Sequence, residues 1–313
     1  MESNRRQTAV VTGIAGFIGS YLAGRLVERG WVVRGLDNER SGDWRRVTVP
    51  VERIDRDLAS LADGELLSLC RGADVLFHLA AEKYNSSKST PERIIDVNIS
   101  ATRRLFAAAA RAQVGRVIFT SSLYAYGALG PEWMSEGDVP APTTMYGLSK
   151  VAGEHLLRVA ARDHGLRWTV ARLFFIYGPG QYAEGGYKSV ILRNFERIRR
   201  GERPVILGDG EQALDYVYVD DCVDALLAML GPQHEGLTYN VAAGRAITVN
   251  ELTRLMLRTA GSNLAPVPGP ADWTAGTVRV GSPRLSAERL AWRATTPIEE
   301  GLARVWRWLG ERS

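Results

Sequence analysis

The chain has 313 residues, enough for one large α/β domain or two smaller ones, and its 45% hydrophobic and 24% charged residues are ordinary for a globular protein. The formal net charge of +4 is small and the basic residues are spread out, so nucleic acid is not expected as a partner. The sequence has no apolar run of about 18 residues, so we expect no membrane span. The first residues, MESNRRQ, lack an apolar segment, so we expect no signal peptide.

Cys70 and Cys222 are the two cysteines, and both lie in apolar helical patterns. Their positions do not have the spacing of metal ligands, so no bound metal is expected. Buried free thiols fit a reducing compartment, and we therefore expect a cytoplasmic protein.

The most informative stretch is 8–20, TAVVTGIAGFIGS. It predicts a strand buried on both faces, a glycine turn, and a helix over 17–29 that ends at Gly30. In a dinucleotide-binding unit, Gly13 would permit the turn, Gly16 would let a pyrophosphate approach the backbone, and Gly19 would let the helix lie close to the strand. The spacing is GxxGxxG rather than GxGxxG, and the alternative is a bare strand–helix turn.

A second predicted strand, 31–36, leads directly to Asp37, about 20 residues beyond the glycine turn. A carboxylate there can accept hydrogen bonds from an adenosine ribose and would repel a 2′-phosphate. The sequence therefore predicts NAD rather than NADP, although Arg40 is close enough in sequence to weaken this preference.

Strands and helices alternate from the start of the chain, which predicts an α/β fold with a doubly wound parallel sheet. The expected strands are 74–79, 116–121 and 168–173, and the expected long helices are 92–111 and 146–162. Gly165 is the expected stop of the second helix.

Beyond Gly178 the alternation becomes irregular. We predict a Rossmann-type nucleotide-binding domain over 1–178 and mostly a smaller substrate-binding lobe over 179–313, with 216–221 as a strand that returns to the large sheet. In the lobe we expect strands at 205–207 and 238–241, a helix at 221–230, a helix capped by Thr248 and Glu251, a loop at 261–276, and a last helix that starts at Pro297.

Tyr146 and Lys150 lie four residues apart on a predicted helix, and hence on one face. A tyrosine phenol has a pKa near 10, but a nearby ammonium and an oxidised nicotinamide both favour the phenolate. The pair could therefore take a proton from a substrate hydroxyl while hydride leaves for the cofactor. The alternative is a surface tyrosine with an unrelated lysine.

Ser121 and Ser122 end a predicted strand at the carboxyl edge, where open α/β sheets bind ligands. A hydroxyl at this place could hydrogen-bond the same substrate oxygen, and we favour Ser122. The alternative is that both serines only cap the strand.

With these residues in view, the chain resembles the extended short-chain dehydrogenase/reductases, in particular the NAD-dependent epimerase/dehydratase group. The resemblance covers nearly the whole chain and rests on TGIAGFIG (12–19), Asp37, Asp57-Leu58, HLAA (78–81), Asn98, TSSLYAYG (120–127), YGLSK (146–150), YGPGQ (177–181) and YVYVDD (216–221). It implies NAD as cofactor, a sugar as substrate and the catalytic residues Tyr146, Lys150 and Ser122. The cofactor contacts that it implies are Gly13, Gly16, Phe17, Ile18, Gly19, Asp37, Asp57, Leu58, Ala80, Ala81, Lys83, Asn98, Tyr146 and Lys150.

The chain departs from the family pattern on the substrate side. Leu123 and Tyr124 stand where dehydratases carry an acidic pair, so dehydration is not expected. Phe175 stands in place of an asparagine that helps hold a nucleotide sugar, and Leu214 in place of an arginine that grips its diphosphate. A further arginine near position 270 is also missing. The expected substrate contacts are Ser122, Tyr124, Phe175, Lys188, Arg193, Leu214 and Arg279, of which Lys188, Arg193 and Arg279 could rebuild the grip.

The leading hypothesis is an NAD-dependent sugar epimerase, similar to UDP-glucose 4-epimerases, that oxidises a sugar transiently and returns hydride to the opposite face. The first alternative is an NAD-dependent dehydrogenase or ketoreductase acting on a sugar or small alcohol without a nucleotide diphosphate. The second is a non-catalytic NAD-binding regulator. The family resemblance also implies a homodimer formed through the two long helices, unless these helices pack only on their own sheet.

Overall fold

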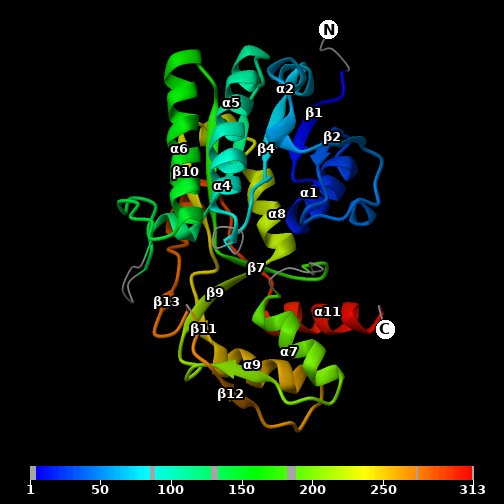
Figure 1. Cartoon of the computed structure of the whole chain (residues 1–313), viewed down its shortest axis with the longest axis vertical. Helices are drawn as coiled ribbons and strands as arrows, with labels where there is room; N and C mark the ends of the chain where they lie inside the picture. The colour runs from blue at the N-terminus through cyan, green and yellow to red at the C-terminus, as the bar shows by residue number, and fades with distance from the viewer. Residues whose placement is uncertain (1–4, 85–88, 128–132, 182–187, 273, 312–313) are drawn as a thin grey trace.

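The larger lobe of the protein is built around a parallel sheet. The computed structural model describes residues 5–84, 89–127, 133–181, 188–272 and 274–311. Seven strands form the sheet in the spatial order β10-β6-β5-β4-β1-β2-β3 (Figure 1), which confirms the doubly wound α/β fold. Their bounds are β1 (Thr8–Thr12), β2 (Val32–Asp37), β3 (Glu52–Asp55), β4 (Val75–His78), β5 (Val117–Ser122), β6 (Trp168–Leu173) and β10 (Leu237–Val241).

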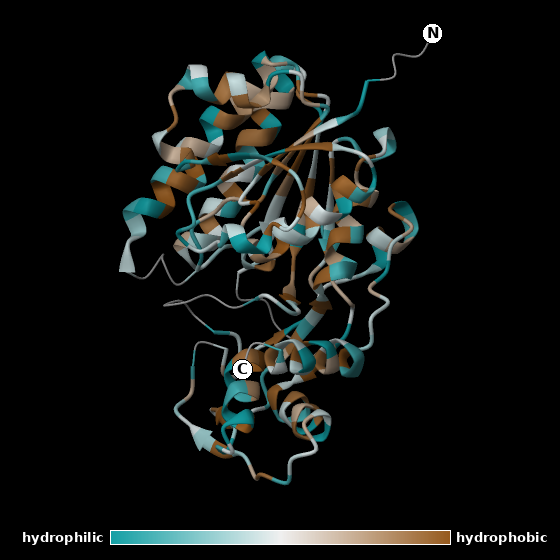
Figure 2. Ribbon diagram, turned by 90° about the vertical axis from the view of Figure 1, so that its right-hand side faces the viewer, coloured by the Kyte–Doolittle hydropathy of each residue, from teal (hydrophilic) through white to brown (hydrophobic). Residues whose placement is uncertain are grey.

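Helices cover both faces of this sheet, and β1 shows how its side chains divide between two cores. Ala9 and Val11 pack with α1 and α8 on one face, whereas Val10 packs with α2, α5 and α6 on the other. Figure 2 shows the hydrophobic strands enclosed by helices with hydrophilic outer faces. The helices are α1 (Phe17–Glu28), α2 (Asp63–Cys70), α4 (Pro91–Arg93), α5 (Thr102–Arg111), α6 (Met145–His164) and α8 (Val219–Ala228), with 3₁₀ turns at Trp44–Arg46, Leu58–Ser60, Leu123–Ala125 and Pro232–His234.

The smaller lobe lies below the carboxyl edge of the large sheet in Figure 1. In its four-stranded sheet, β9 pairs with β7, β11 and β13, and a separate parallel pair joins β8 and β12. The elements after β6 are β7 (Phe175–Tyr177), α7 (Val190–Arg199), β8 (Val205–Leu207), β9 (Ala213–Tyr218), β11 (Ala246–Thr248), α9 (Val249–Thr259), β12 (Val267–Gly269), β13 (Val278–Arg279), α10 (Arg284–Arg289) and α11 (Ile298–Gly310).

The prediction that 216–221 returns to the large sheet is wrong. That segment is divided between β9, which belongs to the second sheet, and the start of α8. All six residues of β9 are buried, so its sequence looks like a central strand of the large sheet. The strand that does return is β10, which pairs with β6 although we placed it in the smaller lobe. The chain therefore crosses between the lobes more than once after residue 178.

Most other predicted elements are present, with small shifts in their ends. The expected helix over 92–111 is divided into α4, a π-helical segment Ile94–Ala101, and α5. Thr248 caps α9 by accepting a hydrogen bond from the Glu251 backbone, as expected. The last helix begins at Ile298 rather than Pro297, and the predicted loop over 261–276 contains the short strand β12. Among the described residues, we find no helix that is both long and apolar enough to span a membrane.

The cysteines and the end of α6 also agree with the sequence. Cys70 and Cys222 are buried free thiols, one in each core. Helix α6 stops at Gly165, whose φ of 68° is a left-handed conformation that glycine adopts at low cost.

A buried ion pair fastens α6 to the sheet. Glu154 on α6 has no exposed surface and accepts two hydrogen bonds from Arg172 on β6, at 2.9 Å from Nε and 2.8 Å from a terminal nitrogen. The hydroxyl of Ser121 on β5 donates to the same carboxylate at 2.6 Å. One carboxylate therefore joins the helix to two neighbouring strands.

We predict that Glu154→Ala lowers the free energy of unfolding by about 3–5 kcal/mol, because it leaves the Arg172 guanidinium buried without its counter-ion. Arg158→Ala is the matched control. Arg158 contacts the same carboxylate, but at the longer distance of 3.6 Å and with a side chain that is 39% exposed. This substitution should cost about 1 kcal/mol or less. Chemical denaturation of both variants measures the difference, and equal losses would contradict the prediction.

Candidate active site

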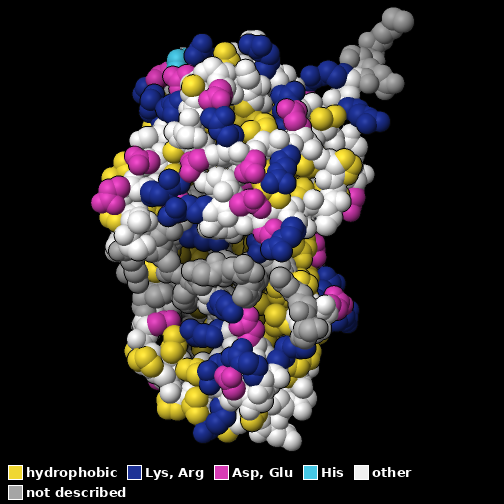
Figure 3. Space-filling model, turned by 45° about the vertical axis from the view of Figure 1, so that its right-hand side comes forward, with side chains coloured by type: hydrophobic (Ala, Val, Ile, Leu, Met, Phe, Trp, Pro, Cys, Tyr) yellow, Lys and Arg dark blue, Asp and Glu magenta, His cyan; other side chains and the backbone are white. Residues whose placement is uncertain are grey.

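A large cleft runs from the carboxyl edge of the parallel sheet to the smaller lobe. Its volume is about 1580 Å³, more than the 300–1,000 Å³ of a typical small-molecule site. Figure 3 shows the hollow between the lobes, with Lys and Arg side chains at its margin. The cleft is large enough for a dinucleotide and a second ligand together.

The glycine turn forms a close-fitting backbone wall at one end of this cleft. Gly13 has a φ of 74°, and a Cβ placed on it would lie 2.8 Å from the backbone nitrogen of Ala80. A Cβ on Gly19 would collide with the carbonyl oxygen of Gly13. Gly16 is the N-cap of α1, whose first turn contains no acidic residue. The turn and helix terminus therefore fit a pyrophosphate.

Asp37 lies at the end of β2 and is 9% exposed. Its two oxygens accept hydrogen bonds from the backbone nitrogens of Ala15, at 3.0 Å, and Glu39, at 2.8 Å. Each oxygen keeps a further lone pair that can accept from a ribose hydroxyl. Burial raises the pKa of Asp37, against the lowering effect of these hydrogen bonds. Arg40 is held 3.0 Å from Glu82, which balances its charge, and the Asp37 carboxylate at the end of β2 fits the free ribose diol of NAD.

An ion-pair cluster closes the adenosine end, and sequence reasoning missed two of its members, Glu82 and Arg93. Glu82 is 4% exposed and binds both Arg40 and Arg93 at 3.0 Å, and Arg93 also donates to Asp57 at 2.7 Å. Asp57 in turn caps the 3₁₀ turn that begins with Leu58. The residues come from four separate segments, so no local pattern could have revealed the cluster.

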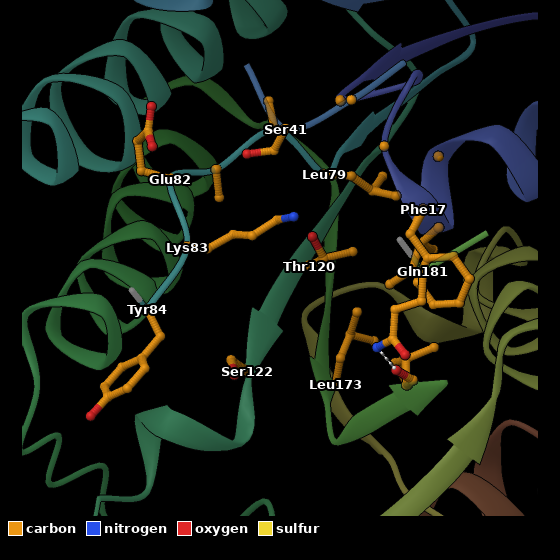
Figure 4. Close-up of a pocket in the computed structure, with 18 of the residues that line it drawn as sticks. Phe17, Ser41, Leu79, Glu82, Lys83, Tyr84, Thr120, Ser122, Leu173 and Gln181 are labelled. Carbon is orange, nitrogen blue, oxygen red and sulfur yellow. Dashed lines mark hydrogen bonds between the residues drawn. The ribbon is translucent and has the colours of Figure 1, made fainter. Parts of the chain in front are cut away.

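The other expected cofactor residues lie around the same end of the cleft. Phe17, Ile18, Ala80, Ala81 and Lys83 line it, and Figure 4 shows Lys83 extending across it. Asn98 is not among the described lining residues. Its side chain instead bonds the backbone nitrogen and oxygen of Glu82 and the hydroxyl of Ser149. Asn98 therefore positions the loop after β4 against α6.

Tyr146 and Lys150 face the cleft from the first turns of α6, which Thr144 caps. The Lys150 ammonium is buried, donates to the carbonyl oxygen of Thr120 at 2.9 Å, and lies 5.7 Å from the centre of the Tyr146 ring. Burial lowers the pKa of Lys150 to about 8, although the negative charge of Glu154 raises it. The ammonium is thus held beside the phenol ring.

The two serines of β5 face different partners. Ser121 donates to Glu154, whereas Ser122 hydrogen-bonds Tyr146. Burial raises the pKa of Tyr146 to about 12, and the Ser122 hydrogen bond lowers it. Since burial alone opposes ionisation, a phenolate at neutral pH needs the ammonium of Lys150 and a cationic ring bound nearby.

Aromatic side chains lie next to Tyr146 in the cleft. Tyr124 stacks on Tyr84, with ring centres 5.0 Å apart, and its edge meets Tyr146 at 5.5 Å. The guanidinium of Arg279 lies 5.6 Å from the centre of the Tyr124 ring and is 8% exposed. Phe175 and Leu214 also line the cleft.

The three cations proposed to rebuild a diphosphate grip are placed differently. Arg193 lines the cleft. Lys188 does not belong to the described lining and pairs with Glu196 at 2.7 Å. Arg279 lies over the Tyr124 ring and is also absent from that described lining. Of the three, the structure brings only Arg193 to the described wall of the cleft.

A family model described as the NAD dependent epimerase/dehydratase family matches residues 9–242. A UDP-glucose 4-epimerase of Mycolicibacterium smegmatis is 32% identical, and the match covers 95% of this chain and 96% of that protein. The crystal structure of a Thermotoga maritima UDP-glucose 4-epimerase with UDP-glucose has a TM-score of 0.92 at 31% identity, covering 98% of this chain and 99% of the other.

Two further relatives bind or act on other nucleotide sugars. The structure of MoeE5 in complex with UDP-glucuronic acid and NAD has a TM-score of 0.88 at 32% identity, covering 98% of this chain and all of the other. A dTDP-glucose 4,6-dehydratase of Streptomyces griseus is 29% identical over 96% of this chain and 93% of that protein. Proteins that are about as similar to this chain as the epimerases therefore include an enzyme with a different reaction.

Proposed function

Because this chain belongs to the NAD-dependent epimerase/dehydratase family, we propose that it is a nucleotide-sugar 4-epimerase. The observation that carries the proposal is the meeting of Tyr146, Lys150 and Ser122 in one cleft whose other end fits a dinucleotide. The relatives that cover the chain almost completely include UDP-glucose 4-epimerases. Bound NAD would supply a reversible acceptor for hydride from a sugar carbinol.

The residues of this chain would move the proton and hold the sugar oxygen. Tyr146, as phenolate, would accept the proton of the 4-hydroxyl, while Ser122 donates a hydrogen bond to the same oxygen. The ammonium of Lys150 would lower the energy of the phenolate. After the keto-sugar turns in the cleft, its C4 would receive the hydride back on the opposite face and Tyr146 would return the proton, so that no net oxidation occurs.

A second candidate is an NAD-dependent dehydrogenase or ketoreductase whose substrate lacks a nucleotide diphosphate. The observation that favours it is the apolar wall of Phe175 and Leu214, which offers no charge to a phosphate. Steady-state production of NADH from candidate alcohols would favour this activity over an epimerase.

We predict that Tyr146→Phe lowers the epimerisation rate about a hundred- to ten-thousand-fold and leaves NAD bound, because it removes the acid–base group only. Lys150→Ala should act in the same direction, and the double variant should be little slower than the worse single variant, since the two residues work as a unit. Interconversion of UDP-glucose and UDP-galactose, followed by chromatography, measures the rates. A Tyr146→Phe enzyme with more than about a tenth of the wild-type rate would exclude Tyr146 as the base.

We also propose that the enzyme does not dehydrate its substrate, although a dehydratase is among its relatives. Leu123 is buried and carries no ionisable group, and Tyr124 is held between two aromatic rings. Neither residue supplies the carboxylate chemistry that elimination of water requires. Incubation with dTDP-glucose should yield no 4-keto-6-deoxy sugar, and its appearance by mass spectrometry would contradict the proposal.

We propose a homodimer formed through the helices that follow β4 and β5. Ile95 on the π-helical segment and Leu148 and Val159 on α6 are each more than 40% exposed, which is unusual for large apolar side chains on neighbouring helices. A second copy of this surface could cover them. Light scattering should give about twice the mass of one chain, and a monomer at micromolar concentration would contradict the proposal.

A further inference from the structure

The end of the cleft that lies in the smaller lobe combines apolar side chains with two charged ones among the described residues, Arg193 and Asp272. Its described wall includes Leu207, Leu214, Tyr216 and Val249. Arg193 is the one positively charged side chain that the described residues of the smaller lobe contribute to this wall. A negatively charged part of a ligand at this end of the cleft would therefore meet Arg193.

Arg193 occupies the first turns of α7, directly after the Ser189 cap. Its Nε is buried and has no hydrogen-bond partner among the described residues, and the ion pairs among those residues do not include Arg193. Two other basic side chains on or beside this helix, Arg197 and Arg200, both pair with Glu202. Arg193 thus combines an unused buried donor with a place on the cleft wall.

Gln212, in the turn before β9, provides a second and independent observation. Its side chain is 2% exposed and lines the cleft. The amide nitrogen donates to the carbonyl oxygen of Leu207 at 2.8 Å, whereas the amide oxygen is buried without a partner among the described residues. A buried acceptor without a donor costs free energy, which a ligand hydroxyl or N–H would recover.

A buried cationic donor and a buried neutral acceptor on one wall suit a nucleotide. The guanidinium can bind phosphate oxygens in bidentate geometry, and the amide oxygen can accept from a ribose hydroxyl or a base N–H. The amino-terminal end of α7 adds partial positive charge beside Arg193. Leu214 on β9 offers neither charge nor donor, so this positive charge comes from the helix rather than from the strand.

We infer that Arg193 binds the diphosphate of the nucleotide-sugar substrate and that Gln212 accepts a hydrogen bond from its nucleoside. The inference rests on the proposed function, because it assumes that the substrate carries a nucleoside diphosphate. On this inference Arg193 of α7 contributes to substrate affinity, whereas Tyr146, Lys150 and Ser122 carry out the proton transfer.

The test is calorimetry of UDP, dTDP and GDP with the NAD-loaded enzyme. Arg193→Ala removes hydrogen bonds to a charged group. The variant should therefore bind the nucleotide that the wild type prefers roughly ten- to a hundredfold more weakly. Arg193→Lys keeps the charge and should recover part of this loss. In turnover, Arg193→Ala should raise KM and largely retain kcat, because the contact lies away from the reacting carbon.

Arg200→Ala is the matched control, since Arg200 caps the carboxyl end of the same helix and pairs with Glu202 outside the described lining of the cleft. It should bind nucleotides as the wild type does. If the wild type binds a nucleotide and Arg193→Ala binds it equally well, the inference is wrong and the proposed function stands. If the wild type binds none of the three and turns over no nucleotide sugar, the proposed function falls, and the inference falls with it.

Discussion

The attachment of α6 to the parallel sheet is the constraint on which the active site depends. In the interior, one helical turn beyond Lys150, the Glu154 carboxylate accepts hydrogen bonds from Arg172 and Ser121. Lys150 then reaches the carbonyl oxygen of Thr120, and Tyr146 comes to the open end of the cleft beside Ser122. Removing two charges from water is costly, so this arrangement is stable only because the geometry is bidentate and a hydroxyl completes it. The same carboxylate also supports the positive charge of Lys150.

Elements that follow from local pattern were predictable from the sequence. The strand–turn–helix around Gly13 is fixed by apolar periodicity and by glycines that no other residue can replace sterically. The Thr248 cap and the Gly165 stop depend on residues within a few positions of each other. The partners of β9 and β10 could not be predicted in this way, because a strand buried on both faces has the same sequence pattern in either sheet.

The candidate site divides along the same line. Short spacings along the chain were enough to predict one part of the site. This part consists of the glycines of the turn around Gly13, Asp37, and the Tyr146–Lys150 pair. By contrast, the Arg40–Glu82–Arg93 cluster joins residues that are distant in sequence. Lys188 likewise pairs with Glu196 and does not belong to the described cleft wall. A count of basic residues in the smaller lobe could not have distinguished Lys188 from Arg193. The distinction depends on which side chains already have partners in the fold.

The two ends of the cleft differ in how their positive charges are balanced. At the adenosine end, Arg40 and Arg93 are neutralised by Glu82 and Asp57, so these two arginines add little attraction for an anionic ligand. In the smaller lobe, the apolar side chains of the wall lower the local dielectric response around Arg193, which forms no ion pair among the described residues. A given negative charge therefore gains more free energy at Arg193 than beside the paired arginines. On the inference that Arg193 binds the substrate diphosphate, this contrast would orient two ligands: a dinucleotide with its pyrophosphate on the glycine turn around Gly13, and a second, anionic ligand bound by Arg193.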